Sequence, residues 1–410
     1  MKNGKTKMGV KRNKFKALVF VIILVLASSM FVCCVSAGAP QIEWVKEYPI
    51  KLGFSAYSVQ QTSDGGYIVL GDTRGVEVYS DGRVHCSCLI KVDPNGYEEW
   101  NKTFIGFFGY IQQTFDKGYI LIGSRDFYTI HPRISLLKTD KNGEIEWSKN
   151  LGYGIAFSGQ QTFDGGYIVA GIKDFKIVIL KTNEEGEEEW NRTLDGALCG
   201  NFTLLSPEYF PLILQIPNDG YIVTGTKMII KDVRDDKIST TSDVWLIKMD
   251  REGNEERRKI FNISDNDYIH SIVLTSDGGY VIAGETGDLD RNILMIKTDS
   301  EINEEWIKTF NGSGGYECIQ TSDYGYVVTG DNELIKIDSK GNEEWRKSLG
   351  DITCKSVQQT TNGGYIVAGG TWSPVLIKLT PKVTLTPPGF EAIFAIVGLL
   401  AVTYILRRRK

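Results

Sequence analysis

The chain has little of what builds metal centres and covalent active sites. Its 410 residues include 3 His and 7 Cys. No nucleophile motif, phosphate-binding loop or zinc signature occurs, so we expect no cofactor and no metal. Cys33 and Cys34 fall in the first 37 residues, and the remaining five thiols cannot all pair within one chain. A bridge between Cys318 and Cys354 stays open, but a core of this size does not depend on disulfides.

The three histidines carry no metal-site pattern. His85, His131 and His270 lie in different parts of the chain, and no paired His or carboxylate spacing supports them. The recurring Asp-Gly-Gly turns, such as 64–66, lack the alternating acidic ligands of a calcium loop. Turn chemistry explains these turns, because Asp bonds to its own backbone and Gly supplies a positive φ.

Basic residues are scarce in the body of the chain. The formal net charge is −5, but 11 of the 46 Lys and Arg residues lie before residue 38 or after residue 390, with only one of the 51 acidic residues. The segment between them carries a net charge near −15. That charge excludes nucleic-acid binding, which needs a basic footprint, and it suits a solvated extracellular surface.

The N-terminus has the pattern of an export signal. Seven basic residues precede the apolar run 17–35, and Val35-Ser36-Ala37 offers small residues for cleavage. We predict a signal peptide over residues 1–37. An uncleaved membrane anchor is the alternative, because the run is 19 residues long. In both cases the chain beyond residue 40 is expected outside the cytoplasm.

The last 23 residues hold three features in a fixed order. Pro388-Gly389-Phe390 leads into the apolar segment 392–406, and the basic cluster 407–410 follows. Alone, this order predicts a short transmembrane helix with a cytoplasmic basic stop. It also resembles the archaeal PGF-CTERM sorting signal at 389–410, after a short linker at 381–388. The resemblance implies an archaeal cell-surface protein whose terminal helix an archaeosortase exchanges for a membrane lipid.

One short phrase with a central Tyr recurs seven times. Gly-Tyr followed by two aliphatic residues appears at intervals of 39 to 59 residues, with its tyrosines at Tyr67, Tyr119, Tyr167, Tyr221, Tyr280, Tyr326 and Tyr365. A period of about 40 to 50 residues is that of a four-stranded propeller blade. We therefore predict an all-β fold, a seven-bladed β-propeller over residues 41–380.

The ring is expected to close with its own N-terminal strand. The fourth strand of most repeats carries a Trp seven residues after the end of the third strand, but Pro387 occupies that place in the last repeat. Strand 42–46, which contains Trp44, has no repeat before it. It therefore completes the last blade and leaves no unpaired edge between the first and last blades.

The turn before that Trp reads Asp-x-x-Gly-x-x-x-Trp, which resembles the tryptophan-docking motif of quinoprotein-type propellers. The resemblance implies that outer-strand Trp rings pack between blades, with Arg257 replacing the Trp in the fourth repeat. The docking residues would be Trp44, Trp100, Trp147, Trp190, Trp306 and Trp345. A quinone-dependent enzyme is disfavoured, because no two cysteines are adjacent beyond residue 37.

Long, variable loops follow the second strand of several blades or join one blade to the next. They emerge together on one face, whereas the turns on the other face are short and repetitive. Variable loops on a rigid scaffold usually carry binding, although these loops could equally be solvated segments that pack on the blade beneath. The candidate ligand-binding residues are Arg74, Tyr79, His85, Arg125, Tyr128, His131, Tyr209, Phe210, Arg234 and Asp235.

We therefore predict a non-enzymatic, monomeric surface propeller that binds a glycan or a protein partner. The alternatives are an extracellular hydrolase that acts on polysaccharide with paired loop carboxylates, and a structural component of the cell envelope. Surface glycosylation is plausible, because five sequons occur in the exported region. Their acceptors are Asn101, Asn191, Asn201, Asn262 and Asn311.

Overall fold

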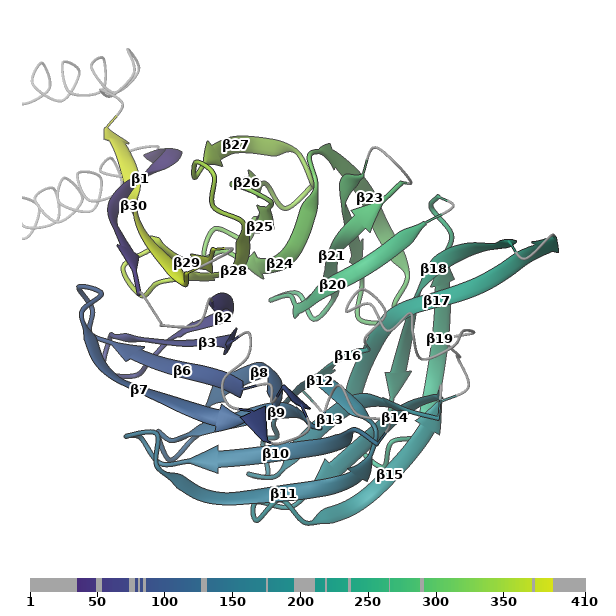
Figure 1. The fold of residues 1–410 in the computed structure, drawn as a ribbon. Helices are drawn as coiled ribbons and strands as arrows, with labels where there is room; N and C mark the ends of the chain where they lie inside the picture. The colour runs from purple at the N-terminus through teal and green to yellow at the C-terminus, as the bar shows by residue number, and fades with distance from the viewer. Residues whose placement is uncertain are drawn as a thin grey trace, which may run out of the picture. The chain divides into compact units, whose positions relative to one another are not determined.

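The computed structural model describes residues 35–48, 54–73, 78–79, 82–83, 86–126, 131–174, 176–194, 211–217, 220–234, 237–264, 266–287, 291–370 and 373–385. The chain divides into two units, Gln41–Thr380 and a unit made of its two ends. The first unit is an all-β propeller in which seven four-stranded antiparallel sheets, the blades, stand around a common axis (Figure 1). The fold is therefore the seven-bladed ring that the repeats predict.

Each blade runs from an inner strand beside the axis to an outer strand at the rim. Blades 1 and 2 consist of β2 (Phe54–Gln61), β3 (Tyr67–Thr73), β6 (Cys86–Val92), β7 (Glu98–Ile105), then β8 (Phe107–Gln113), β9 (Tyr119–Arg125), β10 (Arg133–Thr139) and β11 (Ile145–Tyr153). Blades 3 and 4 consist of β12 (Ile155–Gln161), β13 (Tyr167–Lys173), β14 (Lys176–Thr182), β15 (Glu188–Leu194), then β16 (Leu212–Gln215), β17 (Tyr221–Arg234), β18 (Lys237–Met249) and β19 (Glu255–Phe261).

Blades 5 to 7 complete the ring. Blades 5 and 6 consist of β20 (Asp267–Leu274), β21 (Tyr280–Thr286), β22 (Asn292–Thr298), β23 (Glu304–Asn311), then β24 (Gly314–Gln320), β25 (Tyr326–Gly330), β26 (Glu333–Ile337) and β27 (Glu343–Ser348). Blade 7 consists of β28 (Cys354–Gln359), β29 (Tyr365–Gly369), β30 (Val375–Leu385) and, as its outer strand, β1 (Val35–Glu47). The N-terminal strand therefore closes the ring as predicted.

The bounds of β1 and β30 differ from the sequence expectation at the ends. β1 already begins at Val35, within the predicted signal peptide, and β30 continues to Leu385, through part of the predicted linker. The two strands are neighbours in one sheet, so each supplies backbone hydrogen-bond partners that prolong the other. Residues 1–34 and 386–410, with most of the predicted signal peptide and the predicted terminal helix, lie outside the described residues. Within the described ranges no helix has the length and apolarity to cross a membrane.

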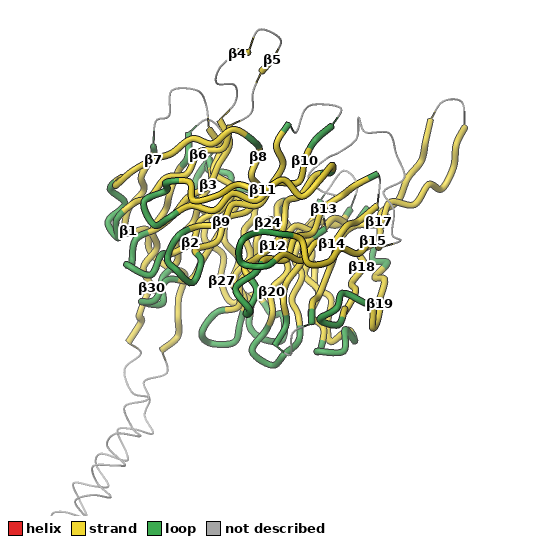
Figure 2. Tube along the Cα trace, turned by 90° about the horizontal axis from the view of Figure 1, so that it is seen from below, coloured by secondary structure: helices red, strands yellow, loops and turns green. Residues whose placement is uncertain are grey.

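Two hairpins extend the second-to-third-strand connections. β4 (Val78–Tyr79) and β5 (Gly82–Arg83) form a small ribbon in blade 1, and β17 and β18 of blade 4 extend well past their neighbouring strands. Both hairpins emerge on the same side of the ring (Figure 2). We call this side the variable-loop face, and the side that carries the first-to-second-strand and third-to-fourth-strand turns the short-turn face.

Tryptophan rings pack edge-on against the tyrosine phrase of the next blade in six of the seven interfaces. The ring centroids of Trp44–Tyr67, Trp100–Tyr119, Trp147–Tyr167, Trp190–Tyr221, Trp306–Tyr326 and Trp345–Tyr365 lie 5.7–6.3 Å apart. Five of these rings, all but that of Trp345, also lie over a described glycine of the next blade. A Cβ added to Gly253, whose φ is +81°, would lie 2.7 Å from the ring of Trp190. The seventh interface has Arg257 in place of the Trp, and Ile302 at a φ of 53° in place of the glycine.

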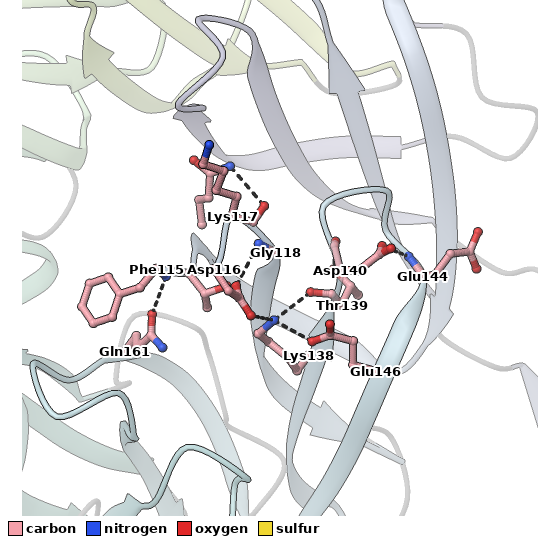
Figure 3. A network of polar contacts seen from close by, with 12 residues as sticks. Phe115, Asp116, Lys117, Gly118, Lys138, Thr139, Asp140, Glu144, Glu146 and Gln161 are labelled. Atoms are coloured by element: carbon pink, nitrogen blue, oxygen red, sulfur yellow. Dashed lines mark hydrogen bonds and ion pairs between the residues drawn. The ribbon is translucent and has the colours of Figure 1, made fainter.

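A buried lysine ties the first-to-second-strand turn to the third and fourth strands within most blades. The Lys138 ammonium lies 2.6 Å from Asp116 and 2.7 Å from Glu146, and it donates to the Thr139 carbonyl at 3.0 Å (Figure 3). An equivalent aspartate, glutamate and backbone carbonyl of their own blades hold Lys91, Lys181, Lys297 and Lys336. The side chains of these lysines are 2–4 % exposed. In blade 4 the side chain of Lys248 is 17 % exposed and instead pairs with Glu301 of blade 5 at 2.6 Å.

Glutamine side chains clamp neighbouring blades on the short-turn face. The last residue of one inner strand accepts the backbone N–H of a turn residue in the preceding blade, as Gln161 does from Phe115 at 2.9 Å (Figure 3). The other clamps are Ser63–Gln113, Phe163–Gln215, Ser276–Gln320, Ser322–Gln359 and Thr361–Gln61, at 2.8–3.0 Å. Leu274 and Pro217 occupy these positions in the interface between blades 4 and 5.

Four cysteines lie in the described part of the ring, and none of them forms a disulfide. Cys86, Cys88, Cys318 and Cys354 are free and buried, so the possible bridge between Cys318 and Cys354 does not form. The Cys318 thiol instead contacts the Ser271 hydroxyl at 3.6 Å. Burial raises the pKa of this thiol to about 12, and it therefore stays protonated at neutral pH.

Candidate functional site

Irregular inner strands bring an extra residue to the axis near the variable-loop face. Each inner strand begins on this face, because it follows a blade-to-blade connection, and a register shift occurs near its start in six blades. The residues at these shifts include Tyr57, Gly109, His270, Tyr316 and Lys355. Bulges of this kind re-aim side chains and are common beside functional sites.

Four residues of blades 5 to 7 meet at this level. The Tyr316 hydroxyl donates to Asp331 at 2.7 Å, and the Lys355 ammonium lies 3.3 Å over the Tyr316 ring. The His270 ring lies 5.7 Å from the same ring. All four side chains are half-buried, so each is shielded from water while part of it remains reachable. We call these residues, together with Glu317, the axial cluster.

The ionisation of the axial cluster is shaped by burial. Burial, and then the hydrogen bond and charge of Asp331, raise the pKa of Tyr316, which keeps its hydroxyl a donor. Burial also lowers the pKa of Lys355, against the charges of Asp331 and Glu285. The cluster therefore combines an aromatic face, a carboxylate and an amine that water solvates only in part.

Glu317 stands out when the inner strands are compared in register. Four blades have a serine at its position, and Ser158, Ser271 and Ser356 each accept a backbone N–H from the next blade. Glu317 does the same with one oxygen, which accepts the Val357 N–H at 2.7 Å. Burial raises the pKa of Glu317 to about 7, although Ser356 and Val357 both hydrogen-bond to it.

Blade 2 has a tyrosine at the same register position. Burial, and after it the charge of Glu317, raise the pKa of Tyr110 to about 12. Blades 2 and 6 are not neighbours in the ring, so the two groups influence each other across the axis. The inner strands of blades 2 and 6 therefore place a phenol and a carboxyl of near-neutral pKa at equivalent register positions.

An ion pair borders the cluster on blade 5. Glu285, which is only 4 % exposed, pairs with Arg291 at 2.7 Å and accepts the Gly314 N–H at 2.8 Å. The Arg291 guanidinium also lies 5.2 Å over the ring of Tyr268. These contacts join the second-to-third-strand loop of blade 5 to the start of β24, so they help to fix the cluster's position.

The candidate ligand-binding residues named from sequence lie apart from the axial cluster or beyond the described residues. Arg125 is exposed at the end of β9, and His131 is exposed with its ring 5.5 Å from that of Tyr153. Tyr79 and Arg234 are described as members of β4 and β17 only. Arg74, His85, Tyr128, Tyr209, Phe210 and Asp235 lie outside the described residues.

The described residues include two of the three histidines and four of the five sequon acceptors. His131 belongs to blade 2 and His270 to blade 5, and in the described part of the chain no three His, Cys, Asp or Glu residues group as metal ligands do. Of the sequon acceptors, Asn101, Asn191 and Asn311 are exposed on outer strands, and Asn262 is also exposed and donates to Asp243 at 2.9 Å. Asn201 lies outside the described residues.

Sequence reasoning missed Glu317, Tyr316 and Lys355. The variable loops carry the usual signals of a binding site, whereas these three residues lie on inner strands that resemble scaffold. The usable signal was the departure from the repeat, since Glu317 replaces a serine that four other blades keep. The bulge that aims Tyr316 and Lys355 at the axis has no comparable sequence signature.

Comparison with known proteins agrees with this architecture. Residues 388–409 match the family model of the PGF-CTERM motif. The WD40 domain of Neurospora crassa Pan2 is 10 % identical with a TM-score of 0.55, covering 85 % of this chain and 98 % of that one. The WD40 β-propeller domain of Doa1 is 14 % identical with a TM-score of 0.50, covering 83 % and 97 %. No curated protein matches the chain.

These likenesses define the class. At such identities the two solved structures establish the fold alone. The chain is a seven-bladed β-propeller that carries a C-terminal PGF-CTERM motif. The motif implies processing by an archaeosortase, and it suggests a cell-surface protein anchored at its C-terminus.

Proposed function

We propose that this protein is a non-enzymatic surface receptor that binds a glycan at the axial mouth of the variable-loop face. The observation that carries the proposal is the Tyr316 ring, which lies at the axis with the Asp331 carboxylate and the Lys355 ammonium against it. Aromatic faces beside hydrogen-bonding charges suit sugar rings, which have apolar faces and polar edges. The acidic, exported body and its C-terminal sorting motif support a role outside the cell.

A protein partner is the other ligand class that this face would fit. The long β17–β18 hairpin extends from the same face and offers strand edges to a partner. The glycan is preferred, because the axial cluster places a half-buried aromatic ring beside an ammonium and a carboxylate.

The experiment is a glycan array probed with the full-length protein in detergent, followed by a pull-down from cell-envelope extract. We expect binding to one glycan class that Tyr316→Ala weakens at least tenfold. Phe163→Ser, which alters an exposed aromatic on the short-turn face, serves as the matched control and should bind normally. Equal binding by the wild type and Tyr316→Ala would reject the axial site, and capture of a protein without any glycan would favour the second ligand class.

A polysaccharide hydrolase is the alternative function, and one observation favours it. A carboxyl with a pKa of about 7 is suited to general acid catalysis, and burial on the inner strand of blade 6 raises the pKa of Glu317 to that value. The array ligand should therefore be incubated with the protein and its reducing ends counted. Release that Glu317→Gln abolishes would replace the receptor proposal with the hydrolase.

A further inference from the structure

A cleft of about 550 Å³ opens on the short-turn face between blades 4 and 5. This interface lacks both the glutamine clamp and the docking tryptophan. Leu274 and Pro217 replace the glutamine clamp, and Arg257 replaces the docking tryptophan. Arg257 donates instead to Asn303 at 2.7 Å, on the outer edge of the interface.

The neighbouring interface provides a direct comparison. A cleft of about 410 Å³ lies between blades 3 and 4, and there Trp190 and Gln215 keep their usual places. Lys181 is held in that interface by Asp164 at 2.9 Å and by Glu189 at 2.9 Å. The larger cleft therefore occurs where the repeat pattern is broken.

One carboxylate in the larger cleft has lost its usual ligand. Glu256 occupies the position of Glu99, Glu146, Glu189, Glu305 and Glu344, which hold the buried lysine in five other blades. The corresponding lysine, Lys248, instead reaches Glu301 of the next blade. Among the described residues no ion pair engages Glu256.

The rest of the lining combines an apolar floor with paired charges. Pro217 and Leu274 supply apolar surface. The charges of Arg251 and Lys248 are balanced by Glu252 at 2.6 Å and Glu301 at 2.6 Å, which leaves the lining negative through Glu256 and Asp250. An uncompensated negative charge above an apolar floor favours a cation that carries an apolar body.

We propose that this cleft binds an alkylammonium group, with its methylene chain on Leu274 and Pro217 and its ammonium at Glu256. The same interaction occurs elsewhere in the ring, because five other blades bind their own lysine ammonium with a glutamate at the same position. The group would come from a free diamine or from a lysine side chain of a partner peptide. The site lies on the face opposite the axial cluster, so it does not rest on the proposed function.

The test uses two probes on the full-length protein in detergent micelles at low salt. Cadaverine represents the free diamine, and Nα-acetyl-lysine amide represents the peptide side chain. Isothermal titration should show saturable binding of at least one probe, while Nε-acetylated lysine amide should not bind. Binding of cadaverine alone would assign the site to free amines, and binding of the lysine amide would assign it to a peptide. No saturable binding of either probe would overturn the proposal.

Variants separate the site from general effects on folding. Glu256→Gln should weaken the bound probe at least tenfold without lowering the thermal midpoint, because this carboxylate has no ion-pair partner among the residues that the structure describes. Glu189→Gln is the matched control in blade 3. It should lower the midpoint, because Lys181 loses a partner, and should leave probe affinity unchanged.

A third variant changes the volume and leaves the charge in place. Leu274→Trp should fill the cleft and abolish binding, with circular dichroism confirming the folded ring. If Leu274→Trp does not fold, Glu256→Lys is the alternative variant. Its lysine ammonium should repel the probe or occupy the site and so prevent binding. Unchanged affinity in Glu256→Gln or Glu256→Lys would overturn the proposal.

Discussion

Leu274 and Pro217 line the same cleft, and they occupy the two positions that form a glutamine clamp in the other six interfaces. The proline in the turn explains why the inner strand opposite it has a leucine and not a glutamine. Proline has no backbone N–H to donate, so a glutamine opposite it would have lost its donor. A leucine avoids that loss and contributes apolar surface to the interface instead.

A double-mutant cycle tests whether the two residues are coupled. Leu274→Gln alone should lower the free energy of unfolding by about 1 kcal/mol, because the new amide meets no N–H. Adding Pro217→Ser should recover about the same amount, because the serine N–H completes the clamp. Urea denaturation of the four proteins gives the coupling energy.

The reverse change at an intact clamp is the control for this cycle. Gln215→Leu removes the acceptor of the Phe163 N–H, which it holds at 2.8 Å, and should cost about 1 kcal/mol. Purely additive effects of Leu274→Gln and Pro217→Ser would mean that the clamp is only a geometric coincidence.

The repeat made the scaffold predictable from sequence. Tyr67 and its six equivalents set the blade count, and Trp44 identified the strand that closes the ring. Equivalent residues make equivalent packing contacts in most blades, so the sequence repeats wherever the structure does. The period of the pattern therefore reports the architecture directly.

The functional candidates were harder to predict, for two physical reasons. Lys355 and Tyr316 reach the axis through register shifts that depend on the backbone of the whole blade and not on a local motif. The cleft beside Glu256 results from several substitutions that are distant in sequence and meet only in the folded ring. The loop sequences alone therefore indicate neither the axial cluster nor the cleft beside Glu256.

Glycine at the docking turn should be essential for a steric reason. Gly253 has a φ of +81°, and an added Cβ would lie 2.7 Å from the Trp190 ring. We expect Gly253→Ala to lower the free energy of unfolding by about 1 kcal/mol for backbone strain and by a further 1–3 kcal/mol for overpacking. Guanidinium denaturation measures the sum.

A second glycine isolates the strain contribution. Gly350 has a φ of +79°, and an added Cβ would meet nothing within 4 Å. Gly350→Ala should therefore cost only about 1 kcal/mol. Equal losses in the two variants would show that the Trp190 ring moves aside and that docking imposes no steric demand.

The ring should lose stability in acid through its turn aspartates. For Asp116, burial raises the pKa, but hydrogen bonds from Lys138, Thr114 and the Gly118 N–H outweigh it and hold the pKa below 3.8. A carboxyl whose folded pKa is depressed contributes stability that is present above its unfolded pKa and is lost as pH falls through the folded value. Stability should therefore decline from about pH 4 downward.

Thermal midpoints between pH 2.5 and pH 6 measure this dependence. Asp116→Asn should start from a lower midpoint at pH 6 and fall less steeply in acid, because it has one proton fewer to take up. Glu304→Gln on the exposed outer strand is the control and should follow the wild type. A slope in Asp116→Asn as steep as that of the wild type would assign the acid sensitivity to other groups.

Glu317 should act in the opposite direction, and at higher pH. Burial raises its folded pKa to about 7, above its ordinary value of 4.5. Its contribution is therefore fully present below pH 4.5 and is lost as pH rises through 7, to a total of roughly 3 kcal/mol. Glu317→Gln keeps an acceptor for the Val357 N–H but cannot ionise, so its midpoint should exceed that of the wild type at pH 8 and match it near pH 4.5. Identical pH profiles for the two proteins would mean that water solvates the carboxylate in the folded ring.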